Sequence, residues 1–374
     1  MTGQRLVHID MLRGAAALLV CIGHVRGLLW VDYGALAYPN VVDRALYFLT
    51  GLGHQAVILF FALSGFLVGG TAFARIRDGE WRAGDYALRR LTRLWTVLLP
   101  ALLFTWALDT LGRDVLGLGG YDGSYWAILS SGPVAGQGAD TSMAAFFTNA
   151  LFLQTIAGPT FGTNGPLWSL ANEFWYYCTI PLAWVALVSP YRWWVRVAAG
   201  LWSVAVMLLL PRELVLLGAI WLIGALTWAF VNRIAPYPAK HRGWLAAVLI
   251  LPVCAGLVLV DLRPGLAADL ALGVATALWL PALACAPAWG GLYAKVSKAI
   301  SEISYTLYVV HFPLLFFLAS ALFLPRQFVP DLTGMAWLVS GVLFAICYAA
   351  VMWRLFERNT DHIRRRMTAM LQRT

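Results

Sequence analysis

Charged residues are scarce in this sequence. Asp, Glu, Lys and Arg together make up 12% of its 374 residues, whereas 61% are hydrophobic and the mean hydropathy is +0.73. A soluble globular chain carries roughly 25% charged residues. The composition therefore excludes an ordinary soluble protein and predicts a polytopic membrane protein of the all-α class.

Several chemical signatures are also missing. The five cysteines form no CxxC pair and no His/Cys cluster, so neither a disulfide framework nor a zinc site is indicated. No GxSxG motif, no acidic metal-binding cluster and no long-period repeat is present. We therefore expect no bound metal and no resident cofactor, and find no support for an inverted-repeat transporter.

What the sequence does contain is a series of apolar segments of near-spanning length, separated by breaks rich in proline and charge. They predict a transmembrane helical bundle in a single domain over 1–374, with short cytoplasmic ends at 1–10 and 355–374. Charges interrupt the first segment too early for a signal peptide, so it is interpreted as the first span. The ten expected helices are 11–30, 47–70, 91–111, 167–188, 194–210, 214–231, 244–260, 266–285, 300–324 and 333–354.

Orientation explains the net charge of +9. With the N-terminus and, after ten helices, the C-terminus in the cytoplasm, all but six of the 27 Lys and Arg residues lie inside, as the positive-inside rule requires. Nucleic-acid binding is therefore not expected, and a bacterial inner (plasma) membrane location is. The six exceptions are Arg26, Arg44, Arg113, Arg212, Arg263 and Arg326.

The longest break, 112–166, falls on the outer side in this topology. Its apolar piece from Phe146 to Gln154 is too short to span a bilayer and predicts an interfacial or re-entrant helix. Because loops of this length are more often functional than idle, it is a candidate cover for an extracytoplasmic substrate.

The first span holds polar residues where hydrocarbon penalises them. Arg13 and His24 are eleven residues apart, which puts them within roughly 20° on one helix face and about 16 Å apart along it. An ionisable residue at that depth costs roughly 2.5 kcal/mol or more and is a functional-site hypothesis by default. The alternatives are a histidine satisfied by a carbonyl, and an Asp10–Arg13 pair that only anchors the helix.

Four further constellations have both a functional and a structural interpretation. Arg90 and Arg93 share a helix face and either grip phosphates or anchor the cytoplasmic end. Ser64 and Gly65 favour close helix packing. Glu173, which follows Trp168 and Ser169 in the sequence, is either a pocket residue or one member of an interhelical pair. The last constellation is Ser304, Tyr308 and His311, which share one face of a helix. Its histidine either belongs to the functional site or satisfies a carbonyl freed by Pro313.

These residues alone leave three chemistries open: acyl transfer, proton-coupled transport, and a lipid-linked glycosyl or phosphoryl reaction. A histidine near mid-bilayer suits general-base catalysis of the first and proton coupling in the second. A purely structural role is disfavoured, because the intramembrane His24, Glu173 and His311 would then have no evident purpose.

Five motifs that follow one another in a fixed order distinguish among these three chemistries. The sequence resembles the acyltransferase family 3 membrane proteins, which O-acylate glycans and other acceptors from acyl-CoA. It departs from the family at Ala56, where glycine is frequent, and at Asn359, where proline commonly follows the charged pair. The motifs are IDMLRGAA (9–16) followed by His24, VILFFALSGFL (57–67), RLTR (90–93), LWSLANEFWYY (167–177) and ISYTLYVVH (303–311).

The resemblance implies a role for each matching residue. His24 would be the catalytic base, Arg13 would line the donor path on the same helix, and Arg90 and Arg93 would engage the CoA moiety. The donor would be acyl-CoA, with acetyl-CoA expected, and the acceptor a hydroxyl of a glycan; membrane lipid surrounds the protein. A proton-coupled transporter or flippase of a glycan or lipid is the alternative. The further pocket candidates are Glu173, Tyr305 and His311, and the structural motif residues are Asp10, Ser64, Gly65, Trp168 and Ser169.

Overall fold

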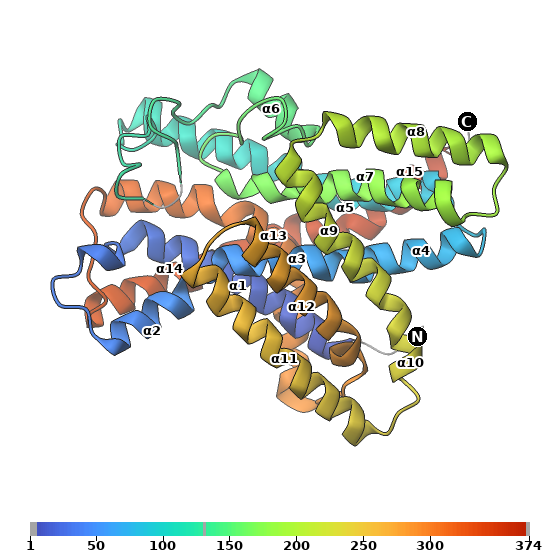
Figure 1. Cartoon of the computed structure of the whole chain (residues 1–374). Helices are drawn as coiled ribbons and strands as arrows, with labels where there is room; N and C mark the ends of the chain where they lie inside the picture. The colour runs from blue at the N-terminus through green and yellow to red at the C-terminus, as the bar shows by residue number, and fades with distance from the viewer. Residues whose placement is uncertain (1–5, 130–131, 372–374) are drawn as a thin grey trace. The chain divides into compact units, whose positions relative to one another are not determined.

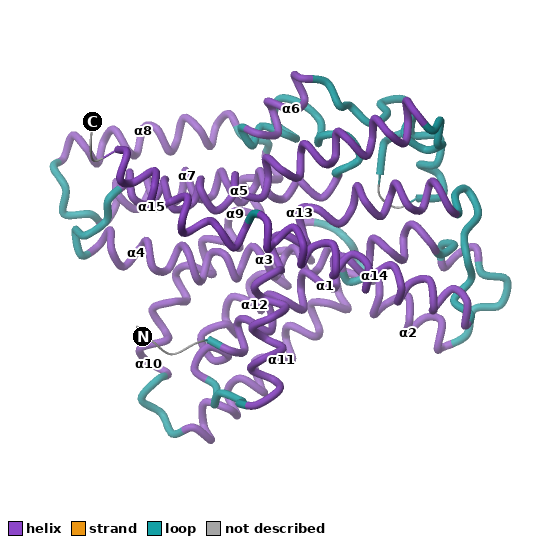
Figure 2. The backbone as a smooth tube through the Cα atoms, turned by 180° about the vertical axis from the view of Figure 1, so that it is seen from behind, coloured by secondary structure: helices purple, strands orange, loops and turns teal. Residues whose placement is uncertain are grey.

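The computed structural model describes residues 6–129 and 132–371; within them helices are joined by loops, and there is no β-strand (Figures 1 and 2). The α-helices are α1 Val7–Leu29, α2 Val41–Thr50, α3 Gly53–Ser64, α4 Gly70–Arg77, α5 Ala83–Thr110, α6 Met143–Ala150, α7 Trp168–Val188, α8 Trp193–Leu209, α9 Arg212–Thr227, α10 Val231–Ile234, α11 Ala239–Leu262, α12 Leu266–Cys285, α13 Gly291–Leu322, α14 Leu332–Leu355 and α15 Thr360–Leu371. Short π-helices at Gly65–Gly69 and Leu111–Val115 extend α3 and α5.

Each of the ten expected segments is largely helical, so the all-α membrane bundle is confirmed. The second, 47–70, is interrupted at 51–52: it covers the end of α2, then α3 and the π-helix that follows. In the described residues, eight helical stretches are long and apolar enough to cross a membrane by length and composition. α7 and α8 lie outside that set, and α8 has only 17 residues. The orientation of the bundle stays a prediction.

Several helices are longer than hydropathy indicated. α13 begins at Gly291, nine residues before the expected start, because its first turns are amphipathic and hydropathy detects only the apolar part. Lys298 and Glu302 pair there at 3.8 Å across one turn.

The apolar piece of the long break forms the short helix α6, which the Ser142 side chain caps by accepting from the backbone N–H of Ala145 at 3.1 Å.

The chain divides into two compact units, each assembled from three segments. Unit 1 comprises 1–16, 54–82 and 172–302, and unit 2 comprises 17–53, 83–171 and 303–374. The continuous helices α1 and α13 contribute to both units. The single-domain interpretation of 1–374 stays a prediction.

In unit 1, α9 packs closely against α3 and the π-helix that follows it. A Cβ atom on Gly65 would lie 2.0 Å from the carbonyl oxygen of Trp221, and one on Gly224 would lie 2.4 Å from that of Ala62. Both distances are shorter than any side chain tolerates, so these glycines allow the backbones to approach. This contact positions Ser64 and Trp221 next to each other.

In unit 2, buried polar side chains hold the segment before α7. Asp109 on α5 is fully buried and accepts from the backbone N–H of Thr163 at 2.7 Å and from its hydroxyl at 2.8 Å. Gln154 donates to the carbonyl of Leu167 at 2.8 Å. The start of α7 is thereby fixed against α5 and α13, which carry candidate site residues.

The glycine contact in unit 1 predicts a stability effect. Gly65→Ala should destabilise the protein by about 1–3 kcal/mol or more, because the added methyl group meets the Trp221 carbonyl. Thermal unfolding of the detergent-purified protein measures this as a lower melting temperature. The control is Gly84→Ala on α5, where a Cβ has nothing within 4 Å; equal melting of both variants would contradict the packing argument.

Candidate functional site

Two histidines from different helices meet in unit 2. Nδ1 of His24 on α1 lies 2.8 Å from Nε2 of His311 on α13, and the rings stack with centroids 5.0 Å apart at 27°. Phe312 presents its ring to His24 in a T-shaped contact at 5.0 Å. His311 is fully buried, whereas His24 is only partly covered by protein. The pair thus has one deep and one accessible imidazole.

The hydrogen bonds of His311 fix which nitrogens carry protons. Its Nδ1 lies 2.8 Å from the carbonyl oxygen of Leu307, which only accepts, so this Nδ1 must donate. In a neutral imidazole Nε2 is then an acceptor, and His24 donates to it from Nδ1. Nε2 of His24 is left with a lone pair, and in the described part of the chain it makes no hydrogen bond. The arrangement leaves a lone pair at a defined atom.

The proline of α13 does not account for His311. Pro313 lacks an N–H, so it frees the carbonyl of Val309, four residues earlier. That carbonyl accepts from the side-chain amide of Asn164 at 2.9 Å. His311 bonds a different carbonyl, and the sequence-based alternative that it satisfies the proline-freed group does not describe this structure.

The start of α7 is bonded to α13 in unit 2. Tyr308 donates to the carbonyl of Pro166 at 3.0 Å, so its hydroxyl accepts from Ser169 at 2.5 Å. Trp168 is the first residue of α7 and is partly buried. Ser304, on the same face of α13, is buried. These contacts support α13 next to the histidine pair.

The arginine pair lies on α5 in unit 2. Arg93 is exposed, whereas Arg90 is half-buried and its Nε atom is buried. Directly after Arg93, the carbonyl of Leu94 accepts from the Tyr305 hydroxyl at 3.1 Å. Tyr305 therefore connects α13 to the arginine-bearing part of α5.

Sequence reasoning gave no role to Glu357, and the structure does. Its carboxylate accepts from the hydroxyl of Thr306 on α13, and the Thr306 backbone N–H lies 3.3 Å from it. Glu357 and Arg358 are the charged pair that precedes Asn359 in the sequence, but nothing in the sequence indicated a partner for Glu357. Glu357 anchors the end of α14 beside Tyr305.

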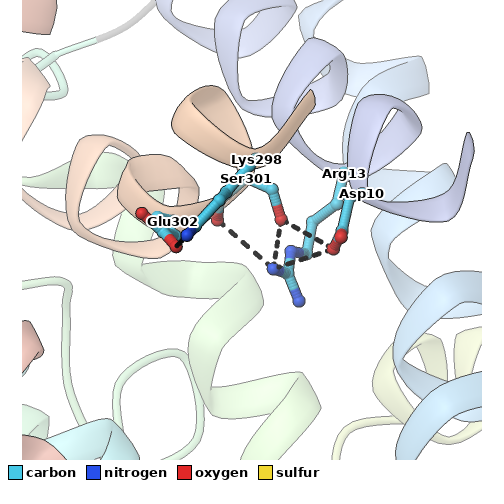
Figure 3. Close-up of polar contacts among 5 residues, drawn as sticks. All are labelled: Asp10, Arg13, Lys298, Ser301 and Glu302. Atoms are coloured by element: carbon cyan, nitrogen blue, oxygen red, sulfur yellow. Dashed lines mark hydrogen bonds and ion pairs between the residues drawn. The ribbon is translucent and has the colours of Figure 1, made fainter. Parts of the chain in front are cut away.

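Arg13 belongs to a polar cluster in unit 1 (Figure 3). Its guanidinium lies 3.5 Å from the Asp10 carboxylate and donates to the carbonyl of Ser301 at 3.3 Å and to its hydroxyl. The Ser301 hydroxyl donates to Asp10 at 3.0 Å. The Asp10–Arg13 spacing is thus a real pairing, and Ser301 of α13 is the partner that the sequence did not identify.

Glu173 lies in a second cluster of unit 1 that joins three helices. Its carboxylate accepts from Ser64 of α3 at 2.6 Å and from the hydroxyl of Tyr177, one turn along α7. Trp221 of α9 donates its indole N–H to the Ser64 hydroxyl at 3.1 Å. Ser64 therefore makes polar contacts in addition to its place beside Gly65.

Comparison with known proteins identifies the chain type. The family model of acyltransferase family 3, described as an acyltransferase domain, matches residues 6–354. The match covers every candidate residue except Glu357 and selects acyl transfer over transport among the alternatives. Searches of curated proteins and of solved structures gave no match.

The Glu173 cluster gives a testable expectation. Glu173→Ala removes the shared acceptor of two hydroxyls and should destabilise the protein by about 1–3 kcal/mol. Glu173→Gln keeps an acceptor oxygen and should melt close to wild type. Thermal unfolding in one detergent compares them. If both variants melt alike, the carboxylate does not hold α3 and α7 together.

Proposed function

The chain belongs to acyltransferase family 3 and is an integral membrane acyltransferase; on this premise we propose that it moves an acyl group from cytoplasmic acyl-CoA to a hydroxyl of a glycan or glycosylated acceptor, with His24 as general base. The observation that carries the proposal is the chain of hydrogen bonds from the Leu307 carbonyl through His311 to His24. We further propose acetyl-CoA as a donor and the bacterial inner membrane as the location.

The proposed reaction uses the lone pair on Nε2 of His24. This nitrogen takes the proton of the acceptor hydroxyl while the oxygen attacks the thioester carbonyl. The new C–O bond forms, the C–S bond breaks, and the CoA thiolate leaves. The proton on His24 passes to that thiolate, so CoA departs as the thiol and the imidazole returns to its neutral state.

His311 acts in this proposal as a positioning residue. By accepting from Nδ1 of His24 it holds the ring in one orientation and one tautomer, with Nε2 available. The edge of Phe312 restricts the same ring from another side. A direct transfer and a route through an acyl-histidine both start from this Nε2 and differ in kinetics.

The donor path rests on arginines. Arg93 is exposed and Arg90 half-buried, three residues apart on α5, and guanidinium groups suit forked hydrogen bonds to the phosphates of CoA. Arg13 lies on the same helix face as His24, about 16 Å toward the N-terminus. We propose that it borders the donor on the way to the base, held in place by Asp10 and Ser301.

His24→Ala should lower acyl transfer by at least about 100-fold, because the base is lost. His311→Gln should give an intermediate loss, since an amide oxygen can still accept from His24. The assay follows the transfer of radiolabel from acetyl-CoA to the acceptor. It uses membranes from the native host, in which the gene for this protein has been replaced by the gene for each variant. His362→Ala, an exposed histidine of α15, is the control. Full activity of His24→Ala at normal protein levels would refute the assigned role.

The double variant Arg90→Gln/Arg93→Gln should raise the KM for acyl-CoA about tenfold or more, with a smaller effect on the KM for acceptor, because each lost phosphate contact weakens donor binding. Arg89→Gln, on the neighbouring exposed position of the same helix, is the matched control. An unchanged donor KM in the double variant would make these arginines topology anchors only.

A further inference from the structure

Unit 2 contains an apolar groove between α1, α13 and α14 that the proposed reaction has not used. Its volume is about 300 Å³, and nearly all of its exposed wall is apolar. Leu28 and Leu315 are buried in its wall, whereas Trp337 and Phe344 are 41% and 50% exposed at its open side. Ser340 contributes the one hydroxyl among the described lining residues. The groove can therefore take a hydrocarbon chain.

The groove continues from the histidine pair along both helices. On α1 its wall begins at Val25, the residue after His24, and includes Leu28, one turn beyond that histidine. On α13 it begins at Leu315, one turn beyond His311, and extends to Phe323. The eight steps from Leu315 to Phe323 correspond to about 12 Å of helix. The groove thus starts next to the proposed reaction centre and leads away from it.

The direction of the groove selects its occupant. In the proposed function CoA phosphates bind at Arg90 and Arg93, and the thioester carbonyl lies at His24. The groove residues on α1 follow His24 toward the C-terminal end of that helix, which is the end remote from the cytoplasm in the predicted topology. An acyl chain that extends past the thioester would enter the groove at its His24 end.

We propose that this groove binds the acyl chain of the donor, and that the donor class extends beyond acetyl-CoA to medium-chain acyl-CoA. The inference rests on the proposed function, because it takes the thioester to lie at His24. Methylene groups of the chain would replace lipid or solvent against Leu28, Leu315 and Phe344. Chain-length preference is then set by the depth of the groove.

Equilibrium binding to the purified protein in lipid nanodiscs tests this without knowledge of the acceptor. Acetyl-CoA, octanoyl-CoA, dodecanoyl-CoA and CoA are the probes, and binding to empty nanodiscs is subtracted. Octanoyl-CoA should bind the wild-type protein at least about tenfold more tightly than acetyl-CoA, because added methylenes in an apolar pocket give selectivity of that order.

Two variants should shift this preference in opposite directions. Ser340→Phe fills the groove and should reduce the ratio of octanoyl-CoA to acetyl-CoA affinity to about one. Leu318→Ala enlarges it and should move the preference toward dodecanoyl-CoA. Ala336→Phe introduces the same side chain at an exposed position of α14 outside the groove and is the matched control for Ser340→Phe. Damage to the fold would lower binding of every donor together and leave the ratio unchanged.

The outcomes separate the two proposals. Equal binding of acetyl-CoA and octanoyl-CoA to the wild type, or an unchanged ratio in Ser340→Phe, overturns the groove assignment and leaves the proposed function standing. If Ser340→Phe instead loses a co-purified phospholipid at constant donor ratio, the groove holds a membrane lipid and the assignment is equally refuted. Failure of any CoA ester to bind would overturn the proposed function itself.

Discussion

Polar side chains among apolar helices must find their partners within the protein, and this constraint determines how both units are assembled. Hydrocarbon offers no competing hydrogen bond, so a group that lacks a protein partner costs several kcal/mol. Arg13 meets this requirement through Ser301, Glu173 through Ser64, and His24 through His311. In each case the partner comes from another helix. The residues that look costly in the sequence are therefore the ones that specify which helices pair.

The sequence could predict what lies along one helix but not what lies across two. Hydropathy located the ten helical segments, and the three-residue spacing of Asp10 and Arg13 correctly implied that they pair. Ser301 lies within the expected helix 300–324, but it could not be identified as their partner, since no spacing relates residues of α13 to residues of α1. The same limit concealed the contact between His24 and His311. Both residues were candidates, yet no spacing relates positions so far apart in the chain.

Proline in α13 illustrates how a local rule needs the tertiary structure. Pro313 predicted a freed carbonyl, and its position in the chain made His311 the obvious group to satisfy it. In the structure Asn164 reaches that carbonyl from the segment before α7, which Asp109 and Gln154 hold in place. Because Asn164 satisfies that carbonyl, His311 bonds the carbonyl of Leu307 and the ring of His24 instead. A loop residue with no signal in the sequence thus supports the chemistry of the site.

The choice of a second histidine, in place of a carboxylate, suits a base inside a membrane protein. A carboxylate beside His24 would carry a permanent charge, and a buried charge costs far more than a buried neutral group. With both imidazoles neutral, the chain from the Leu307 carbonyl through His311 to His24 carries no charge. In the proposed reaction, charge appears only while His24 holds the acceptor proton, and the lone pair of His311 is then already aligned with Nδ1–H of the imidazolium. On this proposal the base is oriented without a permanent charge in a medium of low dielectric constant, and the hydrogen bond from Nδ1 to His311 stabilises the transient charge when it forms.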